Sequence, residues 1–132
     1  MRTNIQPDKE KAKALKKMAD VTLERLNETP IEKYPTNTLN DFYDILHKLL
    51  EAYTLSRGVK FKGEGAHKEL VDYGARELSL EEEKRIFLQQ MREYRNKISY
   101  EGFIIHSNYI KLNRDKINTI IKELDEALLK VL

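Results

Sequence analysis

The 132-residue chain contains no cysteine, which excludes disulfides, thiolate zinc sites and cysteine nucleophiles. It also lacks any apolar run close to the roughly 18–20 residues that a membrane-spanning helix needs. The first eight residues contain no apolar stretch of the kind found in a signal peptide. We therefore expect a cytoplasmic protein that makes no contact with a membrane.

Motifs for bound phosphates and metals are absent too. The sequence has no glycine-rich phosphate loop, no His-Glu-x-x-His pair and no calcium loop. His47 and Glu51 are four residues apart and can share a helix face, but two groups are too few for a metal site. His67 falls at an expected helix start, where capping or packing explains it, and His106 falls in a short apolar link. We expect no metal and no cofactor.

The composition is that of a globular protein with a heavily charged surface. Hydrophobic residues make up 40% of the chain and charged residues 35%. The net charge is only +2, so overall charge gives no argument for a polyanionic partner. The length fits one domain, which we expect to span residues 1–132.

Apolar residues recur at helical spacing along most of the chain, and no stretch of useful length alternates as a strand does. This pattern predicts an all-α, up-and-down antiparallel bundle of about five helices with short connections. Proline, glycine and capping residues set their expected limits. The first three expected helices span residues 7–28, from Thr38 or Asn40 to Gly58, and residues 66–76. The fourth begins at a capping box formed by Ser79 and Glu82 and ends no later than Gly102. The fifth begins at Ser107 or Asn108.

The segment from Arg95 to Gly102 is the best candidate for a functional site. Arg95 and Asn96 lie next to the apolar face of the fourth expected helix, and Tyr100 follows four residues after Asn96. An arginine fork can bind a phosphate through two hydrogen bonds, and a phenol nearby can donate another. Alternatively, Arg95 neutralises Glu51, a carboxylate among apolar neighbours that needs a partner. The two interpretations are compatible.

The pattern Arg95-Asn96-x-x-x-Tyr100-x-Gly102 resembles the signature of the HEPN family, and residues 43–70 are similar to that family's second and third helices. The resemblance implies a five-helix bundle that pairs as a homodimer. In the family's ribonucleases, an arginine is followed after four to six residues by a histidine. Two such motifs face each other across the dimer and cleave RNA without a metal.

The chain departs from this signature at the histidine. The positions where it would stand hold Tyr100, Glu101 and Gly102, and His106 comes eleven residues after Arg95. Tyrosine has an ordinary pKa near 10 and is a poor base at neutral pH. Loss of a general acid–base group typically lowers a rate by about 10²–10⁴. We therefore expect weak ribonuclease activity at best.

Three hypotheses remain open at this stage. The first is a noncatalytic homodimer that binds a nucleotide, RNA or a nucleotidyltransferase partner at Arg95, Asn96, Tyr100 and Gly102, with Glu51 close by. The second is a metal-independent endoribonuclease, the toxin of a toxin–antitoxin pair, with Arg95 and Tyr100 as catalytic candidates. The third is a helical dimerisation module without a ligand. The resemblance also makes Tyr100 a candidate acceptor of a transferred nucleotide.

Overall fold

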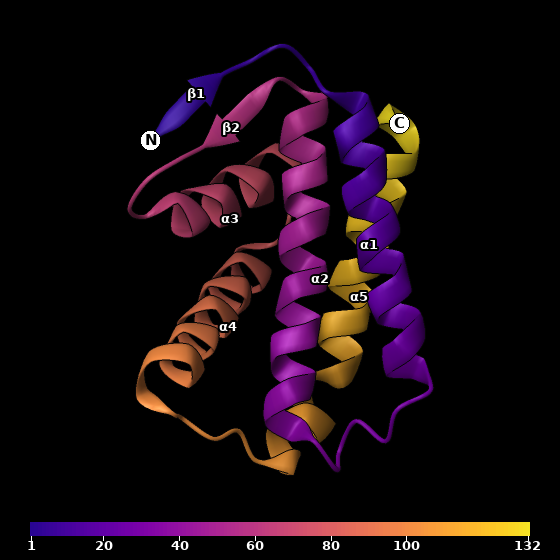
Figure 1. Cartoon of the computed structure of the whole chain (residues 1–132), viewed down its shortest axis with the longest axis vertical. Coiled ribbons are helices and arrows are strands. Elements are labelled where there is room, and N and C mark those ends of the chain that lie inside the picture. The colour runs from indigo at the N-terminus through magenta and orange to yellow at the C-terminus, as the bar shows by residue number, and fades with distance from the viewer.

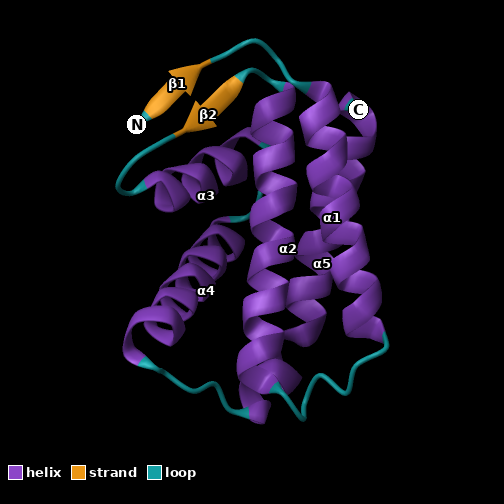
Figure 2. Ribbon diagram, viewed as in Figure 1, coloured by secondary structure: helices purple, strands orange, loops and turns teal.

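The computed structural model describes residues 1–132 and confirms the all-α helical bundle (Figures 1 and 2). Five helices carry the core, and two short strands pair at one end of it. None of the helices combines the length and apolarity needed to cross a membrane. The elements in chain order are β1 (Arg2–Asn4), α1 (Lys9–Asn27), α2 (Pro35–Ser56), β2 (Val59–Phe61), α3 (Ala66–Glu77), α4 (Glu82–Glu101) and α5 (Ser107–Val131).

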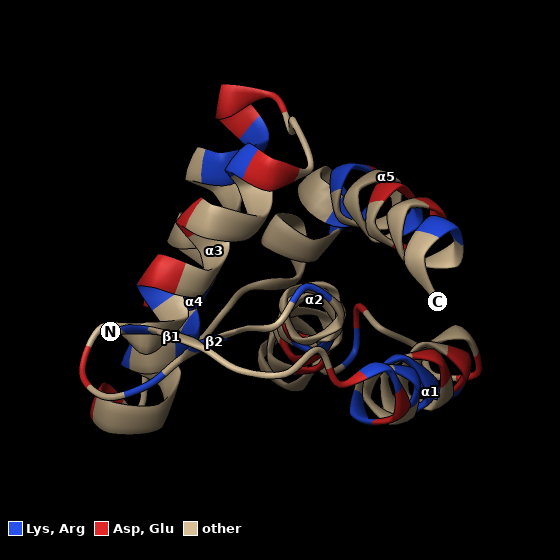
Figure 3. Cartoon of the chain, turned by 90° about the horizontal axis from the view of Figure 1, so that it is seen from above, with Lys and Arg blue, Asp and Glu red and all other residues tan.

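Helix α2 is the centre of the bundle. It packs against all four other helices, and Figure 3 shows it from above between α1 and α5 on one side and α3 with α4 on the other. The wide apolar arc of this helix is therefore covered within one chain. The side chains that bury this arc include Leu39, Phe42, Ile45, Leu46, Leu49, Leu50 and Tyr53.

The helix directions alternate along the chain, with α3 running across the bundle. Helices α1 and α4 run down Figure 1, and α2 and α5 run up. Helix α2 is therefore antiparallel to α1 and α4 but runs in the same direction as its large neighbour α5. The C-terminal end of α4 and the N-terminal end of α5 consequently lie at the same end of the molecule, joined by the link at residues 102–106.

Several predicted helix ends are wrong, and the hydrogen bonds explain why. Helix α2 begins at Pro35, and Thr38 lies inside it, where its hydroxyl donates to the Ile31 carbonyl at 2.9 Å. Ser79 forms no capping box, because its backbone has a φ of 54° and its N–H donates to the Arg76 carbonyl in the turn after α3. Helix α5 begins at Ser107 with His106 as its N-cap and no side-chain cap.

The first helix is better predicted. Asp8 is its N-cap, and the carboxylate Oδ1 accepts a hydrogen bond of 3.0 Å from the Lys11 backbone N–H. An acidic cap also suits the positive end of the helix dipole. The helix that follows, residues 9–27, therefore begins and ends within two residues of the expected limits.

The two strands were not predicted. Strands β1 and β2 pair antiparallel with Thr3 opposite Lys60. Each strand is only three residues long, which is too short for an alternating pattern to be recognised in the sequence. Gly58 leads into β2 with a φ of 74°, and its carbonyl accepts from the Ile5 N–H at 2.8 Å. The strand pair therefore anchors the N-terminal segment beside the end of α2 (Figure 2).

Candidate functional site

The predicted site residues on α4 gather at its C-terminal end. Arg95 is exposed, and its Nη1 donates to the Ser99 hydroxyl at 3.1 Å, one turn along the same helix. Asn96 is half-buried, whereas Tyr100 is 85% exposed. Gly102 ends the helix in the left-handed conformation with a φ of 68°, and its N–H donates to the Lys97 carbonyl. This end of α4 therefore presents a guanidinium and a phenol to solvent.

Glu51 does not belong to this group. Arg95 forms no ion pair with it, and Glu51 instead lines a cavity between α2, β2 and α3 together with Lys60 and Lys62. The prediction that Arg95 neutralises Glu51 is therefore wrong. The reason is geometric, since Glu51 lies towards the end of α2 that joins β2, while α4 runs antiparallel to α2 and carries Arg95 towards the opposite end.

The structure adds a row of aromatic rings that the sequence analysis did not connect. Tyr43 and His47 are four residues apart on α2, with ring centroids 6.0 Å apart, and His67 of α3 lies 4.3 Å from His47. The Tyr43 hydroxyl is buried without a hydrogen-bond partner. Burial raises the pKa of Tyr43 to about 12, and the charges of Arg92 and Arg95 oppose that rise. The two arginines of α4 therefore lie near this row.

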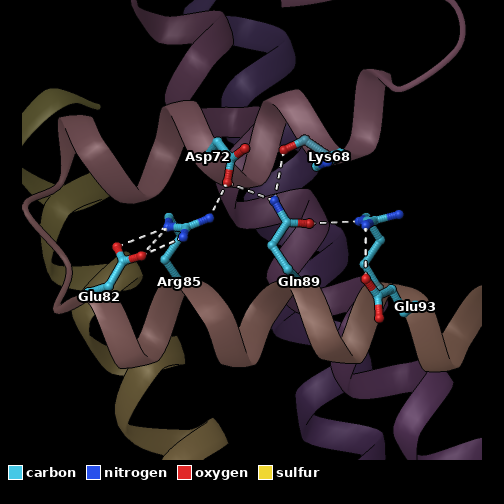
Figure 4. Close-up of polar contacts among 7 residues, drawn as sticks. Lys68, Asp72, Glu82, Arg85, Gln89 and Glu93 are labelled. Atoms are coloured by element: carbon cyan, nitrogen blue, oxygen red, sulfur yellow. Dashed lines mark hydrogen bonds and ion pairs between the residues drawn. The ribbon is translucent and has the colours of Figure 1, made fainter.

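Arg92 is a site residue that the sequence analysis missed. Its Nε donates to the Gln89 side-chain oxygen at 2.7 Å, and the Gln89 amide donates in turn to Asp72 at 2.9 Å and to the Lys68 carbonyl at 3.0 Å. Figure 4 shows how Arg85, which also donates to Asp72, and Gln89 converge on that one carboxylate of α3. Its position three residues before Arg95 was the available signal, because such residues are neighbours on a helix.

His47 is held in its neutral form. Burial lowers the pKa of His47 to about 4, and the nearby His67 and the charges of Lys48 and Arg95 act in the same direction, while Asp44 opposes them. At neutral pH the imidazole therefore carries no charge and is a weak base. It can donate one hydrogen bond and accept another.

This low pKa predicts a loss of stability in mild acid. Unfolded His47 binds a proton near pH 6.5, but folded His47 does so only near pH 4. Protonation therefore favours the unfolded state between these values, and the stabilisation present above pH 6.5 is lost as the pH falls towards 4. We expect His47→Gln to lose less stability over this interval than the wild type in urea unfolding. His106→Gln, at an exposed position, should behave like the wild type, and an equal slope in all three proteins would contradict the assignment.

Two of the lysines of α1 have acidic partners nearby. Lys16 pairs with Asp20 at 3.0 Å and with Asp125 of α5 at 3.6 Å, and Lys13 lies 3.6 Å from Glu10. Figure 3 shows basic and acidic residues interspersed along this helix. The surface of α1 is therefore a mixed-charge face and not a continuous basic track.

Comparisons with protein-family models, curated proteins and solved structures find no match. The functional argument therefore depends on the residues of this chain. Two arginines, one anchored through Gln89 and one exposed, can bind phosphate oxygens by charge-assisted hydrogen bonds. The α4 segment itself supplies no imidazole for acid–base chemistry.

Proposed function

We propose that this protein is a HEPN-like homodimer that binds a nucleotide or single-stranded RNA at the C-terminal end of α4, without being an efficient ribonuclease. The observation that carries the proposal is that Arg95 and Tyr100, both exposed near the C-terminal end of α4, have almost no side-chain partners within the chain. Arginine forks bind phosphates, and exposed aromatic rings stack on unpaired bases. Single-stranded nucleic acid is the ligand class that uses both contacts.

The electrostatics of the region support an anionic ligand. The charges of Arg92 and Arg95 both oppose the rise in the pKa of Tyr43 of α2, so two guanidinium groups act on the same phenol. Arg92 is largely buried and held by Gln89, which limits the side-chain entropy lost on binding. An anchored arginine next to a free one suits a phosphate that enters from solvent.

The homodimer is supported by exposed apolar side chains at the same end of the molecule. Ile104 is 68% exposed in the link after α4, and Leu112 is 81% exposed on α5. Tyr100 and Phe103 are also exposed large side chains of this segment. Burying such a group against a second copy is favourable, and a two-fold interface would bring two Arg95 side chains close together.

The proposal is tested by binding of a labelled single-stranded 12-nucleotide RNA and of AMP, with native mass spectrometry to measure the oligomeric state. Arg95→Ala and Tyr100→Ala should each weaken RNA binding by roughly 10–100-fold, because each removes a contact worth about 1.5–3 kcal/mol. Arg114→Ala is the matched control, since it removes an exposed arginine of α5. Its effect should stay within about twofold.

Three outcomes would count against the proposal: a wild-type protein that binds neither ligand, an equal loss in Arg114→Ala, or a monomer at all concentrations. The same RNA, incubated in chelator, tests the enzymatic alternative. Cleavage by the wild type that disappears in Arg95→Ala would show that the protein is a metal-independent endoribonuclease. His47, on which the charge of Arg95 acts, and its neighbour His67 would then be imidazoles to examine.

A further inference from the structure

A second region has the features of a ligand pocket, and it shares His47 and His67 with the aromatic row described above. It is a cavity of about 280 Å³ between α2, β2 and the start of α3, and Lys11 of α1 reaches its edge. This volume is near the lower end of the range for small-molecule sites, about 300–1,000 Å³. None of Arg92, Arg95, Asn96 or Tyr100 lines it.

The cavity has an excess of unpaired positive charge. Lys11, Lys60 and Lys62 line it, and none of them forms an ion pair within the chain, whereas Lys16 and Lys48 each pair with an aspartate. Glu51 is the only carboxylate among the lining residues. Three ammonium groups against one carboxylate leave room for an anion of about two charges, which is the charge of a phosphomonoester at neutral pH, about −1.5 to −2.

The remaining polar groups suit hydrogen bonding to a neutral part of the same ligand. His47 and His67 lie on one wall with their rings 4.3 Å apart, and His47 is uncharged at neutral pH. Glu51 has no hydrogen-bond donor on its carboxylate from within the chain, since its contact with Thr54 is through the backbone carbonyl. A carboxylate of this kind accepts hydrogen bonds from hydroxyl groups.

We propose that this cavity binds a phosphomonoester carried on a sugar, with the phosphate among Lys11, Lys60 and Lys62 and a sugar hydroxyl donating to Glu51. Phe61 and Leu70 complete the lining with apolar surface that packs against the sugar carbons. The sugar is either a free metabolite or the 5′ end of a nucleic acid, because both present the same group. The proposal does not depend on the function of the α4 site.

The experiment is calorimetric titration of the full chain with ribose 5-phosphate and, separately, with inorganic phosphate. The double variant Lys60→Gln with Lys62→Gln should bind ribose 5-phosphate at least about tenfold more weakly, because it loses charge-assisted hydrogen bonds. Lys122→Gln, which changes an exposed lysine of α5, should bind as the wild type does. Glu51→Ala should weaken ribose 5-phosphate binding relative to inorganic phosphate binding, because it removes the acceptor for the sugar hydroxyl and leaves the three lysines in place.

Three further arms make the result decisive. In the wild type, the imidazole NMR signals of His47 and His67 should shift with ribose 5-phosphate while those of His106 stay fixed, a measurement that no folding defect of a variant can affect. Arg95→Ala should retain this binding, so failure at one site is distinguishable from failure at the other. Tighter binding of a 5′-phosphorylated RNA than of its 5′-hydroxyl form would identify a nucleic-acid end as the source. Absence of saturable binding, or equal losses in Lys122→Gln, would overturn the proposal.

Discussion

Replacing Leu46 with alanine is expected to lower the free energy of unfolding by about 2–5 kcal/mol, the range for deleting a large buried side chain. Leu46 is 1% exposed and lies midway along α2, the helix that packs against every other helix. A cavity there removes packing from several helix contacts at once. The surrounding backbone can collapse only partly, because four helices constrain it.

Urea unfolding of the two proteins measures this loss, and a shift of the midpoint with an unchanged slope would identify it as a change in stability. Leu129→Ala is the matched control, since Leu129 of α5 is 72% exposed. Its effect should stay within about 0.5 kcal/mol. Equal effects of the two substitutions would contradict the central position of α2 in the core.

Gly58→Ala is expected to be the most damaging of the glycine-to-alanine substitutions in the chain. Gly58 has a φ of 74°, and a Cβ there would lie 2.6 Å from the Ile5 carbonyl oxygen. The left-handed backbone costs a residue with a Cβ roughly 1–2 kcal/mol. Relief of the clash must shift the backbone at Ile5, whose N–H donates to Gly58, and overpacking of this kind typically costs about 1–3 kcal/mol more.

Gly63→Ala separates the two costs. Gly63 has a φ of 81°, but a Cβ added to it would meet nothing within 4 Å. It should therefore lose only the backbone contribution, and the difference between the two variants in thermal unfolding should report the clash alone. Gly58→Ala should also weaken protection of the β1 amides in hydrogen exchange. If both variants lost the same stability, the close approach of Ile5 to Gly58 would be wrong.

Helical periodicity predicted the bundle because each helix buries a stripe against its neighbours, and the first and third helices follow their sequence signals closely. Helix starts were less predictable, because a side chain suited to capping can be used elsewhere. Thr38 has the right hydroxyl for a cap but donates it back to Ile31 from inside α2. The strands β1 and β2 are stabilised by pairing between distant segments, which a local pattern does not contain.

For the candidate site as well, the sequence predicts what lies within one helix but not which helices lie beside it. The local pattern identified the α4 segment with Arg95, Asn96 and Tyr100, because those residues lie close together in the sequence of one helix. It gave no information on which helices face them, so Glu51 was assigned as a partner and the row of Tyr43, His47 and His67 was not foreseen. Contacts between helices depend on crossing geometry and direction, and neither is encoded in residue spacing.

The pairing of β1 with β2 also bears on the order in which the chain can fold. Thr3 meets Lys60, 57 positions away, and the intervening chain is the α1–α2 hairpin. Closing so long a loop for a few hydrogen bonds is entropically unfavourable until that hairpin has formed. Strand β1 is thus the last element to dock and the first to detach, and its departure would leave the helical core intact while freeing the edge of the strand that carries Lys60.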